Sequence, residues 1–498
     1  MQADYTRSML LIMPEVVAAV TAFVALIGAM LAKRAKDDGG NTAFYIGIIG
    51  MAGALAATVI MYGRHALGTA FYGMIATDPF SLFFRIIAYA SIIYVLLMAV
   101  SSREMKDSRG KWEFVAVISG FGIGMAMMAS SLNLLMIYLS MELLSIMSYL
   151  LVSYGKGVRR SKEAGLKYII YGSIASAFML YGMSLLFGIA HSLNLKDVLN
   201  VFITHGDIST TTVYVATLFV IAGFGFKIAM VPMHMWAPDV YEGAPTPVTA
   251  LLAVASKAAG FAVIMRFFYT AYISSVSMTQ YYADVSPVKW LLLIGIVSAF
   301  TMTIGNIVAI PQNNLKRMLA YSSIAHAGYM LIGLSIVSKD AIGSVLLYLS
   351  VYFFMNLGAF AVVMIVDNSL HSEDIDRYSG LSKVAPGLSA AMTIFLFSLT
   401  GIPPFAGFIG KIVIFLAAVD KGLYWLVIIA VLNTVVSLYY YARVIKKMWL
   451  ETPSGEAVPV KVGILPAAIV ISLLIPTILF GIWWAPLQSF AHFSSFMY

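Results

Sequence analysis

The sequence GFGFKIAMVPMHMWAPDVYEGAPTP, residues 223–247, lies in a strongly apolar region and cannot form one regular helix. Its four prolines, beginning with Pro232, each remove a backbone hydrogen-bond donor and clash with the preceding turn. Irregular backbone at membrane depth is tolerated only where protein or water surrounds it. The stretch therefore predicts a membrane helix that breaks near Pro232, with Lys227 just before the break.

A second break is predicted at SLTGIPPFAG, residues 398–407, and Lys411 follows it closely. Interrupted helices in the two halves of a transporter are a sequence indication of inverted repeats around an ion site near the membrane midplane. The two breaks thus predict two related halves, each with a lysine near its break.

The composition places the whole chain in a membrane. Of its 498 residues, 61% are hydrophobic and 11% are charged, whereas soluble domains carry roughly 25% charged residues. Apolar runs of about 20 residues, the length that crosses a ~30 Å hydrocarbon core, recur along nearly the whole chain. The sequence predicts an all-α polytopic membrane protein with about fourteen spans, at residues 9–32, 43–63, 78–100, 113–130, 132–153, 163–190, 212–235, 246–270, 289–310, 316–337, 340–366, 387–419, 423–449 and 461–485.

The spans group into four predicted segments. These are an N-terminal three-helix segment (1–112), two five-helix segments (113–271 and 289–449) and a C-terminal helix (461–498). Basic residues concentrate in alternate loops, for example Arg159, Arg160 and Lys162 in one and Lys316 and Arg317 in another. By the positive-inside rule these loops face the cytoplasm, which predicts that both termini face the outside.

Five ionisable residues fall well inside predicted spans: Glu142, Lys227, Lys257, His326 and Lys411. A charge at the bilayer centre costs at least ~2.5–3.5 kcal/mol by insertion scales, so such residues usually mark an ion or proton path. A lysine held away from water can release and regain a proton near neutral pH, and an imidazole does so readily. The five residues in succession predict a proton relay.

For four further residues the sequence gives a less specific indication of their role. Lys167 lies near the start of its span, where its side chain can reach the membrane surface. His234, beside Pro232, either relays protons or binds backbone groups that the break leaves free. Arg85 and Arg266 fall inside spans without any motif, and we interpret them as anchors at the membrane interface.

The chain contains no cysteine, which excludes disulfides and a Cys-ligated Fe–S cluster. It also contains no phosphate-binding loop and no His/Cys cluster with metal-ligand spacing. The sequence therefore predicts no cofactor and no metal on this chain.

Eight short motifs carry a family resemblance. They are GFK (225–227), PMHMW (232–236), PDVYEGAPTP (238–247), MELLS (141–145), EAGLKY (163–168), ASK (255–257), YSSIAHAGY (321–329) and GIPPFAGF (401–408). Together they closely resemble the subunit N family, the antiporter-like membrane subunits of the proton-translocating NADH–quinone oxidoreductase (respiratory complex I). The resemblance runs from about residue 110 to 450.

The resemblance implies fourteen helices with two inverted five-helix repeats in the inner membrane of a bacterium. It implies that Glu142 pairs electrostatically with Lys227, that Lys257 is the midplane lysine and that Lys411 belongs to the second broken helix, with His326 placed to connect these two lysines. It also implies that Lys167 is a modulating or entry-side residue. NADH, FMN, Fe–S clusters and quinone are then expected in partner subunits of the membrane and redox arms, including neighbouring antiporter-like subunits, and nucleic acid is not expected as a partner.

Three other functions remain open at this point. A subunit of a multisubunit cation/proton antiporter would carry the same charges without a redox partner. A redox enzyme that binds quinone itself would need a headgroup or cofactor site, which the sequence does not offer. A structural spacer between other membrane subunits would tolerate loss of Lys227.

Overall fold

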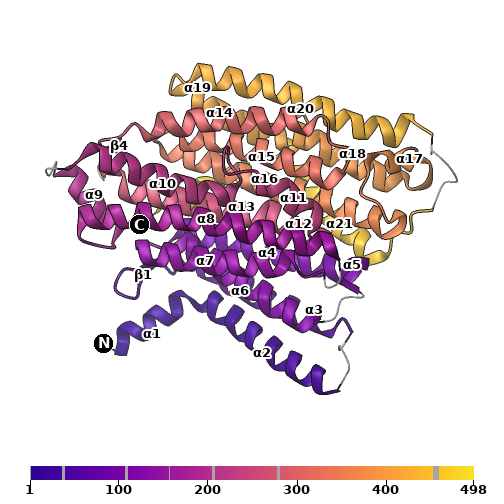
Figure 1. The fold of residues 1–498 in the computed structure, drawn as a ribbon, viewed down its shortest axis with the longest axis horizontal. Helices are drawn as coiled ribbons and strands as arrows, with labels where there is room; N and C mark the ends of the chain where they lie inside the picture. Colours follow the sequence, from indigo (N-terminus) through magenta and orange to yellow (C-terminus); the bar gives the residue numbers. More distant parts are fainter. Residues whose placement is uncertain are drawn as a thin grey trace.

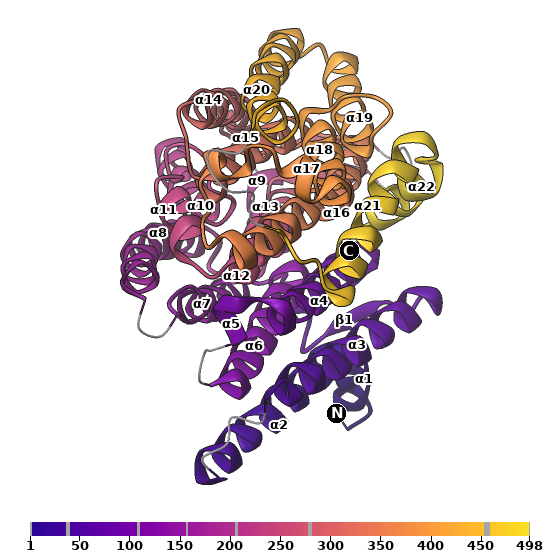
Figure 2. The same cartoon turned by 90° about the vertical axis from the view of Figure 1, so that its right-hand side faces the viewer.

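The computed structural model describes residues 2–35, 40–106, 110–155, 158–204, 208–276, 281–452 and 459–497. Its helices run along the longest axis of the molecule, and the N-terminal helices lie at one edge of the bundle (Figures 1 and 2). The N-terminal segment contains α1 (Gln2–Leu11), α2 (Met13–Ala35), α3 (Thr42–Gly63), β1 (Gly68–Ala70), β2 (Ile75–Thr77), α4 (Pro79–Ser101) and α5 (Arg103–Lys106).

Two helical halves and a C-terminal pair follow. The first half contains α6 (Lys111–Ser130), α7 (Leu134–Val152), α8 (Arg159–Ala190), α9 (Leu195–Ile203), α10 (Thr210–Ile228), α11 (Trp236–Gly243), α12 (Thr246–Leu251), the π-helix η1 (Leu252–Ser256) and α13 (Lys257–Ala271). The strands β3 (Ile273–Val276) and β4 (Tyr281–Asp284) form a hairpin before the second half. The rest of the chain forms α14 (Trp290–Ala309), α15 (Leu315–Leu334), α16 (Lys339–Leu370), the 3-10 helix η2 (Ile375–Tyr378), α17 (Leu381–Val384), α18 (Pro386–Thr400), α19 (Ala406–Asp420), α20 (Tyr424–Leu450), α21 (Ile464–Ile482) and α22 (Ala485–Ser494).

Twelve helices of the described chain are long and apolar enough to cross a membrane. The other two predicted spans are α15, which carries Lys316 and Arg317 near its start, and the pair α18–α19, whose members have 15 residues each. The prediction of an all-α polytopic membrane fold is confirmed.

Both predicted breaks are present. Helix α10 ends at Ile228, and α11 begins at Trp236 after a turn that contains Pro232. Helix α18 ends at Thr400, Gly401 adopts a left-handed φ of 90°, and α19 begins at Ala406. A left-handed residue at a helix end favours glycine, which has no Cβ to clash.

The two halves share a backbone pairing that lies at opposite ends of the bundle. Residues 132–134 pair with 193–195, and residues 313–315 pair with 373–375, each through two backbone hydrogen bonds of 2.8–3.1 Å. The first pairing lies beside α9 and the second beside α17, and these helices occupy opposite ends of the molecule (Figure 1). The same local pairing at opposite ends is what an inverted repeat produces.

The two ends of the bundle differ in the elements and residues that they carry. The hairpin end carries the β1–β2 and β3–β4 hairpins (Figure 1), and the opposite, basic end carries the starts of α8 and α15, which contain Arg160, Lys316 and Arg317. The central helices are α16 and the continuous run α12–η1–α13. The most apolar 18 residues of the run α12–η1–α13 are all buried. Ionisable groups on that run therefore have no contact with lipid or solvent.

The interpretation of Arg85 and Arg266 as interface anchors is wrong. Both side chains are fully buried near the hairpin end and form ion pairs. Arg85 Nε lies 2.7 Å from Glu15 Oε1, and Arg266 Nη1 lies 2.5 Å from Asp78 Oδ2. A buried guanidinium is tolerated when a carboxylate neutralises it, and these carboxylates come from distant parts of the sequence.

Candidate functional site

Glu142 and Lys227 face each other across the contact between α7 and the end of α10. Lys227 is fully buried, and its Nζ donates a 3.1 Å hydrogen bond to Ser145 Oγ. Ser145 lies one helical turn from Glu142 on α7, so the hydroxyl stands beside both charged groups. Oε1 of Glu142 is buried and has no hydrogen-bond partner among the described residues. The predicted pair thus meets at Ser145 without a direct ion pair.

Lys227 also contacts the central helix run. A Cβ placed on Gly260 of α13 would lie 3.4 Å from Lys227 Cβ and 2.5 Å from Ile228 Cγ2. Only a glycine allows α10 and α13 to approach this closely. The Lys227 ammonium lies 5.7 Å from the centroid of the buried Tyr168 ring.

Lys257 is the first residue of α13 and follows directly after η1. Short π-helical turns inside α-helices are frequent at functional sites because they displace side chains and free backbone groups. Lys257 is 1% exposed, and its Nζ donates a 2.5 Å hydrogen bond to the backbone carbonyl of Ser323 on α15. The first half therefore contacts the second half through Lys257.

Around Lys257, buried hydroxyl groups lack partners. The side-chain oxygens of Ser256, Ser323, Tyr168 and Tyr241 are buried without a hydrogen-bond partner among the described residues. Buried polar groups ordinarily find a partner, and ordered water commonly supplies it. These hydroxyls give the region between Lys227 and Lys257 the donors and acceptors that a hydrated proton path requires.

His326 lies on α15 one helical turn beyond Ser323. It is 2% exposed, its Nδ1 lies 2.8 Å from Tyr348 Oη on α16, and its Nε2 lies 3.4 Å from Tyr441 Oη on α20. Both ring nitrogens thus have a hydroxyl partner. A histidine with a partner on each nitrogen can accept a proton on one side and release it on the other.

Lys411 lies near the start of α19, just after the second break. It is 3% exposed, and its Nζ donates a 2.8 Å hydrogen bond to the carbonyl of Thr400, the last residue of α18. The same ammonium lies 4.5 Å from the centroid of the Tyr329 ring on α15. Because Ser323, His326 and Tyr329 are spaced by three residues, one face of α15 connects Lys257 to Lys411.

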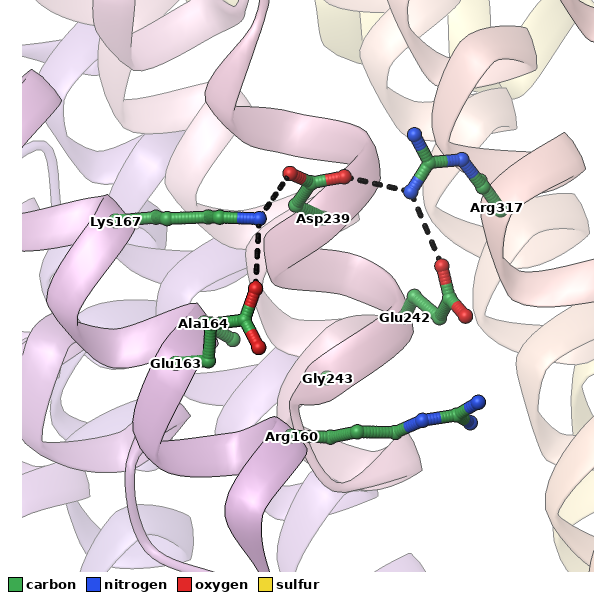
Figure 3. A pocket seen from close by; sticks show the side chains of 8 residues that line it. All are labelled: Arg160, Glu163, Ala164, Lys167, Asp239, Glu242, Gly243 and Arg317. Carbon is green, nitrogen blue, oxygen red and sulfur yellow. Dashed lines mark hydrogen bonds and ion pairs between the residues drawn. The ribbon is translucent and has the colours of Figure 1, made fainter.

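Lys167 lies elsewhere, in an ionic cluster at the basic end that Figure 3 shows. Its Nζ lies 3.0 Å from Glu163 and 2.8 Å from Asp239, and Asp239 also binds Arg317 at 2.6 Å. Arg317 reaches Glu242 at 3.0 Å. These side chains line a cavity of about 240 Å³ together with Arg160, Ala164 and Gly243.

His234 lies in the turn between α10 and α11 and is half-buried. The described contacts do not connect its side chain to Lys227 or Lys257. The structure therefore brings together Glu142, Lys227, Lys257, His326 and Lys411 and leaves Lys167 and His234 apart from them. The described residues contain no group of three or more His, Asp or Glu side chains that could hold a metal ion.

Several residues of the site escaped sequence reasoning. Ser145 and Ser323 bind the lysines, Tyr348 and Tyr441 bind His326, and Asp239 binds Lys167. Tyr348 and Tyr441 lie outside the motifs, and buried tyrosines are common in membrane helices, so the sequence gives no signal for them. Ser145, Ser323 and Asp239 had a signal, because they lie within the MELLS, YSSIAHAGY and PDVYEGAPTP motifs.

Comparisons with known proteins show the family of the chain. Residues 131–437 match the family model described as NADH:quinone oxidoreductase/Mrp antiporter, TM. The chain is 43% identical over 450 residues to NADH-quinone oxidoreductase subunit N 2 of Chloroherpeton thalassium, covering 89% of this chain and 87% of that relative. It is 44% identical over 457 residues to NADH-quinone oxidoreductase subunit N of Anaeromyxobacter sp. (strain Fw109-5), covering 88% of each.

Solved structures give the same result. A chain of respiratory complex I from Thermus thermophilus with bound aureothin matches with a TM-score of 0.77 and 28% identity, over 96% of this chain and 98% of that one. A chain of the Mrp complex from Dietzia sp. DQ12-45-1b shares the fold, with a TM-score of 0.84 at 19% identity over 98% and 97% of the two chains. This chain therefore belongs to the NADH:quinone oxidoreductase/Mrp antiporter membrane family, and within it to the subunit N family of NADH-quinone oxidoreductase.

Proposed function

We propose that this chain is a proton-translocating membrane-arm subunit of an NADH–quinone oxidoreductase, and that Glu142, Lys227, Lys257, His326 and Lys411 carry the protons. One observation carries the assignment of residues. Each of the three buried lysines has a polar or aromatic contact: Lys227 with Ser145, Lys257 with Ser323 and Lys411 with Tyr329, and the contact of Lys257 crosses from the first half to the second. The relatives named subunit N support the activity, and neighbouring antiporter-like subunits of the complex are the expected partners.

In this proposal Glu142 and Lys227 form a switchable pair. With both groups charged, Glu142 holds a proton on Lys227 by Coulomb attraction, which is strong where water is excluded. A redox-driven change in a partner subunit that neutralises Glu142 removes this attraction, and Lys227 releases its proton toward Lys257. The hydroxyls of Tyr168 and Ser256 lie on this route.

The second half completes the path. A proton on Lys257 displaces one through His326, whose two nitrogens contact Tyr348 and Tyr441. Charge on His326 repels charge on Lys411, so each transfer favours the next one. Lys411, beside the second break, is the outer carrier.

Orientation belongs to the proposal as well. The loops rich in Arg and Lys lie at the basic end, which by the positive-inside rule faces the bacterial cytoplasm, so both termini and the hairpin end face outward. Lys167 and Asp239 then lie at the cytoplasmic surface, where their cluster is suited to guide proton uptake. His234 in the turn of the first break is a weaker candidate for the same uptake route.

No cofactor is proposed on this chain. Fe–S clusters would belong to partner subunits, because the chain lacks the cysteines that ligate them. NADH, FMN and quinone are expected in the same partners. Redox chemistry in those partners would therefore drive the charge movements in this chain.

A subunit of a cation/proton antiporter is the alternative, since the Mrp chain shares the fold. The test is to purify the assembly through a tag on this chain and reconstitute it into vesicles. We expect Fe–S and quinone-binding partners, and proton pumping that starts with NADH and quinone and does not require Na⁺. Sodium–proton exchange by an assembly without redox partners would establish the antiporter instead.

Replacing Glu142 tests the switch itself. Glu142→Gln keeps the size and polarity of the side chain but cannot carry charge, so pumping should fall while the complex still assembles. Full pumping in this variant would remove Glu142 from the mechanism.

A further inference from the structure

Four charged side chains near the hairpin end take no part in the proposed relay. They are Glu15 of α2, Arg85 of α4, Asp78 at the start of α4 and Arg266 of α13, and they are called the hairpin-end cluster. All four are buried, with exposures of 0–3%. The cluster is neutral as a whole, because each guanidinium has one carboxylate.

The Arg266–Asp78 pair is held on several sides. Two nitrogens of Arg266 bind the two oxygens of Asp78 at 2.5 and 2.7 Å. Nη2 and Nε of Arg266 also donate to the carbonyl of Ala129 at 2.9 and 3.0 Å, and the guanidinium lies 4.8 Å from the Phe80 ring centroid. A guanidinium in a planar, two-pronged pair is fixed in position and keeps its proton at any physiological pH.

The Arg85–Glu15 pair continues the cluster without a gap. Arg85 donates to the hydroxyl of Ser130 at 3.3 Å and to that of Thr77 at 3.4 Å. Ser130 follows Ala129, and Thr77 precedes Asp78, so adjacent residues join the two ion pairs. The cluster thus connects α2, α4, α6 and α13.

Arg266 stands on the same helix as Lys257, on the side toward the hairpin end. The two residues are separated by roughly 13 Å along the helix axis, from the 1.5 Å rise per residue. The intervening residues of α13, 258–265, are apolar or glycine and all are buried. On α13, a proton leaving Lys257 toward the hairpin end meets first an apolar segment and then a guanidinium that Asp78 already neutralises.

We propose that the hairpin-end cluster closes the outer end of the first half, so that protons on Lys257 leave only toward His326. The inference rests on the proposed proton path through Lys257. An arginine does not release its proton in proteins, so Arg266 cannot pass one on, and residues 258–265 of α13 offer no side chain that binds one. Without such a barrier, a proton could reach Lys257 from outside and the redox energy would be lost as leak.

The consequence of removing Arg266 distinguishes a barrier from a structural clamp. Loss of the guanidinium leaves Asp78 as an uncompensated buried carboxylate, which draws in water or a proton. Both would create an exchangeable site between the outside and Lys257. If Arg266 only stabilised the packing of the helices, its removal would change the stability of the complex and not its proton permeability.

The test measures passive proton flow through the whole complex in vesicles, without NADH, driven by a potassium gradient and valinomycin and read with a trapped pH dye. Arg266→Gln should raise the proton leak at least threefold over the unmodified complex. The double variant Arg266→Gln/Lys257→Ala should return to the unmodified level, because the leak passes through Lys257. Arg266→Lys, which retains a cation, and Arg64→Gln, which removes an exposed charge at the same end, should show no added leak.

An assembled Arg266→Gln complex without added leak, or a leak that persists in the double variant, would overturn the inference. If Arg266→Gln does not assemble, Arg85→Gln is measured with and without Lys257→Ala, and the same two results decide. The proposed function fails separately, if Lys257→Ala alone retains full NADH-driven pumping.

Discussion

Lys257 donates a 2.5 Å hydrogen bond to the backbone carbonyl of Ser323, and this contact joins the central helix run of the first half to α15 of the second. His326 lies one turn beyond Ser323 on α15. A single lysine side chain therefore stands where the two halves exchange protons in the proposed path. In this position Lys257 must release and regain a proton, and a fixed positive charge would not be sufficient.

Lys257→Arg separates proton transfer from charge. Arginine keeps the positive charge and the hydrogen-bond donors but does not release its proton in proteins. We expect NADH-driven pumping to fall as far as in Lys257→Ala, measured by dye quenching in inverted membrane vesicles. Lys316→Arg is the matched control, since Lys316 is also buried but is held by Glu373 at 2.7 Å. Pumping that survives in Lys257→Arg would show that Lys257 supplies only charge or packing.

Ser145→Ala tests the hydroxyl between Glu142 and Lys227. The Lys227 ammonium would lose its 3.1 Å hydrogen bond, and a hydrogen bond to a charged group contributes roughly 1.5–3 kcal/mol. We expect the pumping rate to fall by roughly two- to tenfold while NADH–quinone turnover falls less. Ser140→Ala removes a buried hydroxyl of the same helix whose hydrogen bond, among the described residues, goes to the Ile137 carbonyl, and it should leave pumping intact. Equal rates in the two variants would remove Ser145 from the path.

Gly260→Ala tests the close approach of α10 and α13. The added Cβ would lie 2.5 Å from Ile228 Cγ2, and such overpacking costs about 1–3 kcal/mol. We expect a lower midpoint of thermal unfolding for the purified complex and weaker pumping, because Lys227 is displaced. Gly188→Ala on α8 adds a Cβ with no neighbour within 4 Å and should leave the midpoint unchanged. If both variants unfold at the same temperature, the contact at Gly260 does not constrain α10.

The sequence was sufficient for the features that have a local cause. Proline rules alone located both breaks near Pro232 and Pro403, and a lysine inside an apolar run is visible without any structure. The five relay candidates could be named for the same reason. Their connection could not, because the contacts of Lys257 and Lys411 are made with α15 and α18 through a backbone carbonyl, which any residue offers.

The error on Arg85 and Arg266 has a related cause. Inside a span, an arginine that reaches the membrane surface and one neutralised by a distant carboxylate leave the same pattern in the sequence. Glu15 and Asp78, which neutralise these arginines, lie near the ends of spans. Acidic residues are ordinary there and do not indicate a buried partner. Only the packing of α2, α4 and α13 brings them together.

The central claim is that the buried line of charges moves protons, and Lys227→Ala tests it most directly. The measurement is the number of protons pumped per NADH oxidised by the assembled complex in vesicles, with Lys196→Ala on the exposed side of α9 as control. We predict a clear fall in this ratio for Lys227→Ala and none for Lys196→Ala. Pumping and turnover that both remain at the unmodified level in Lys227→Ala would contradict the relay.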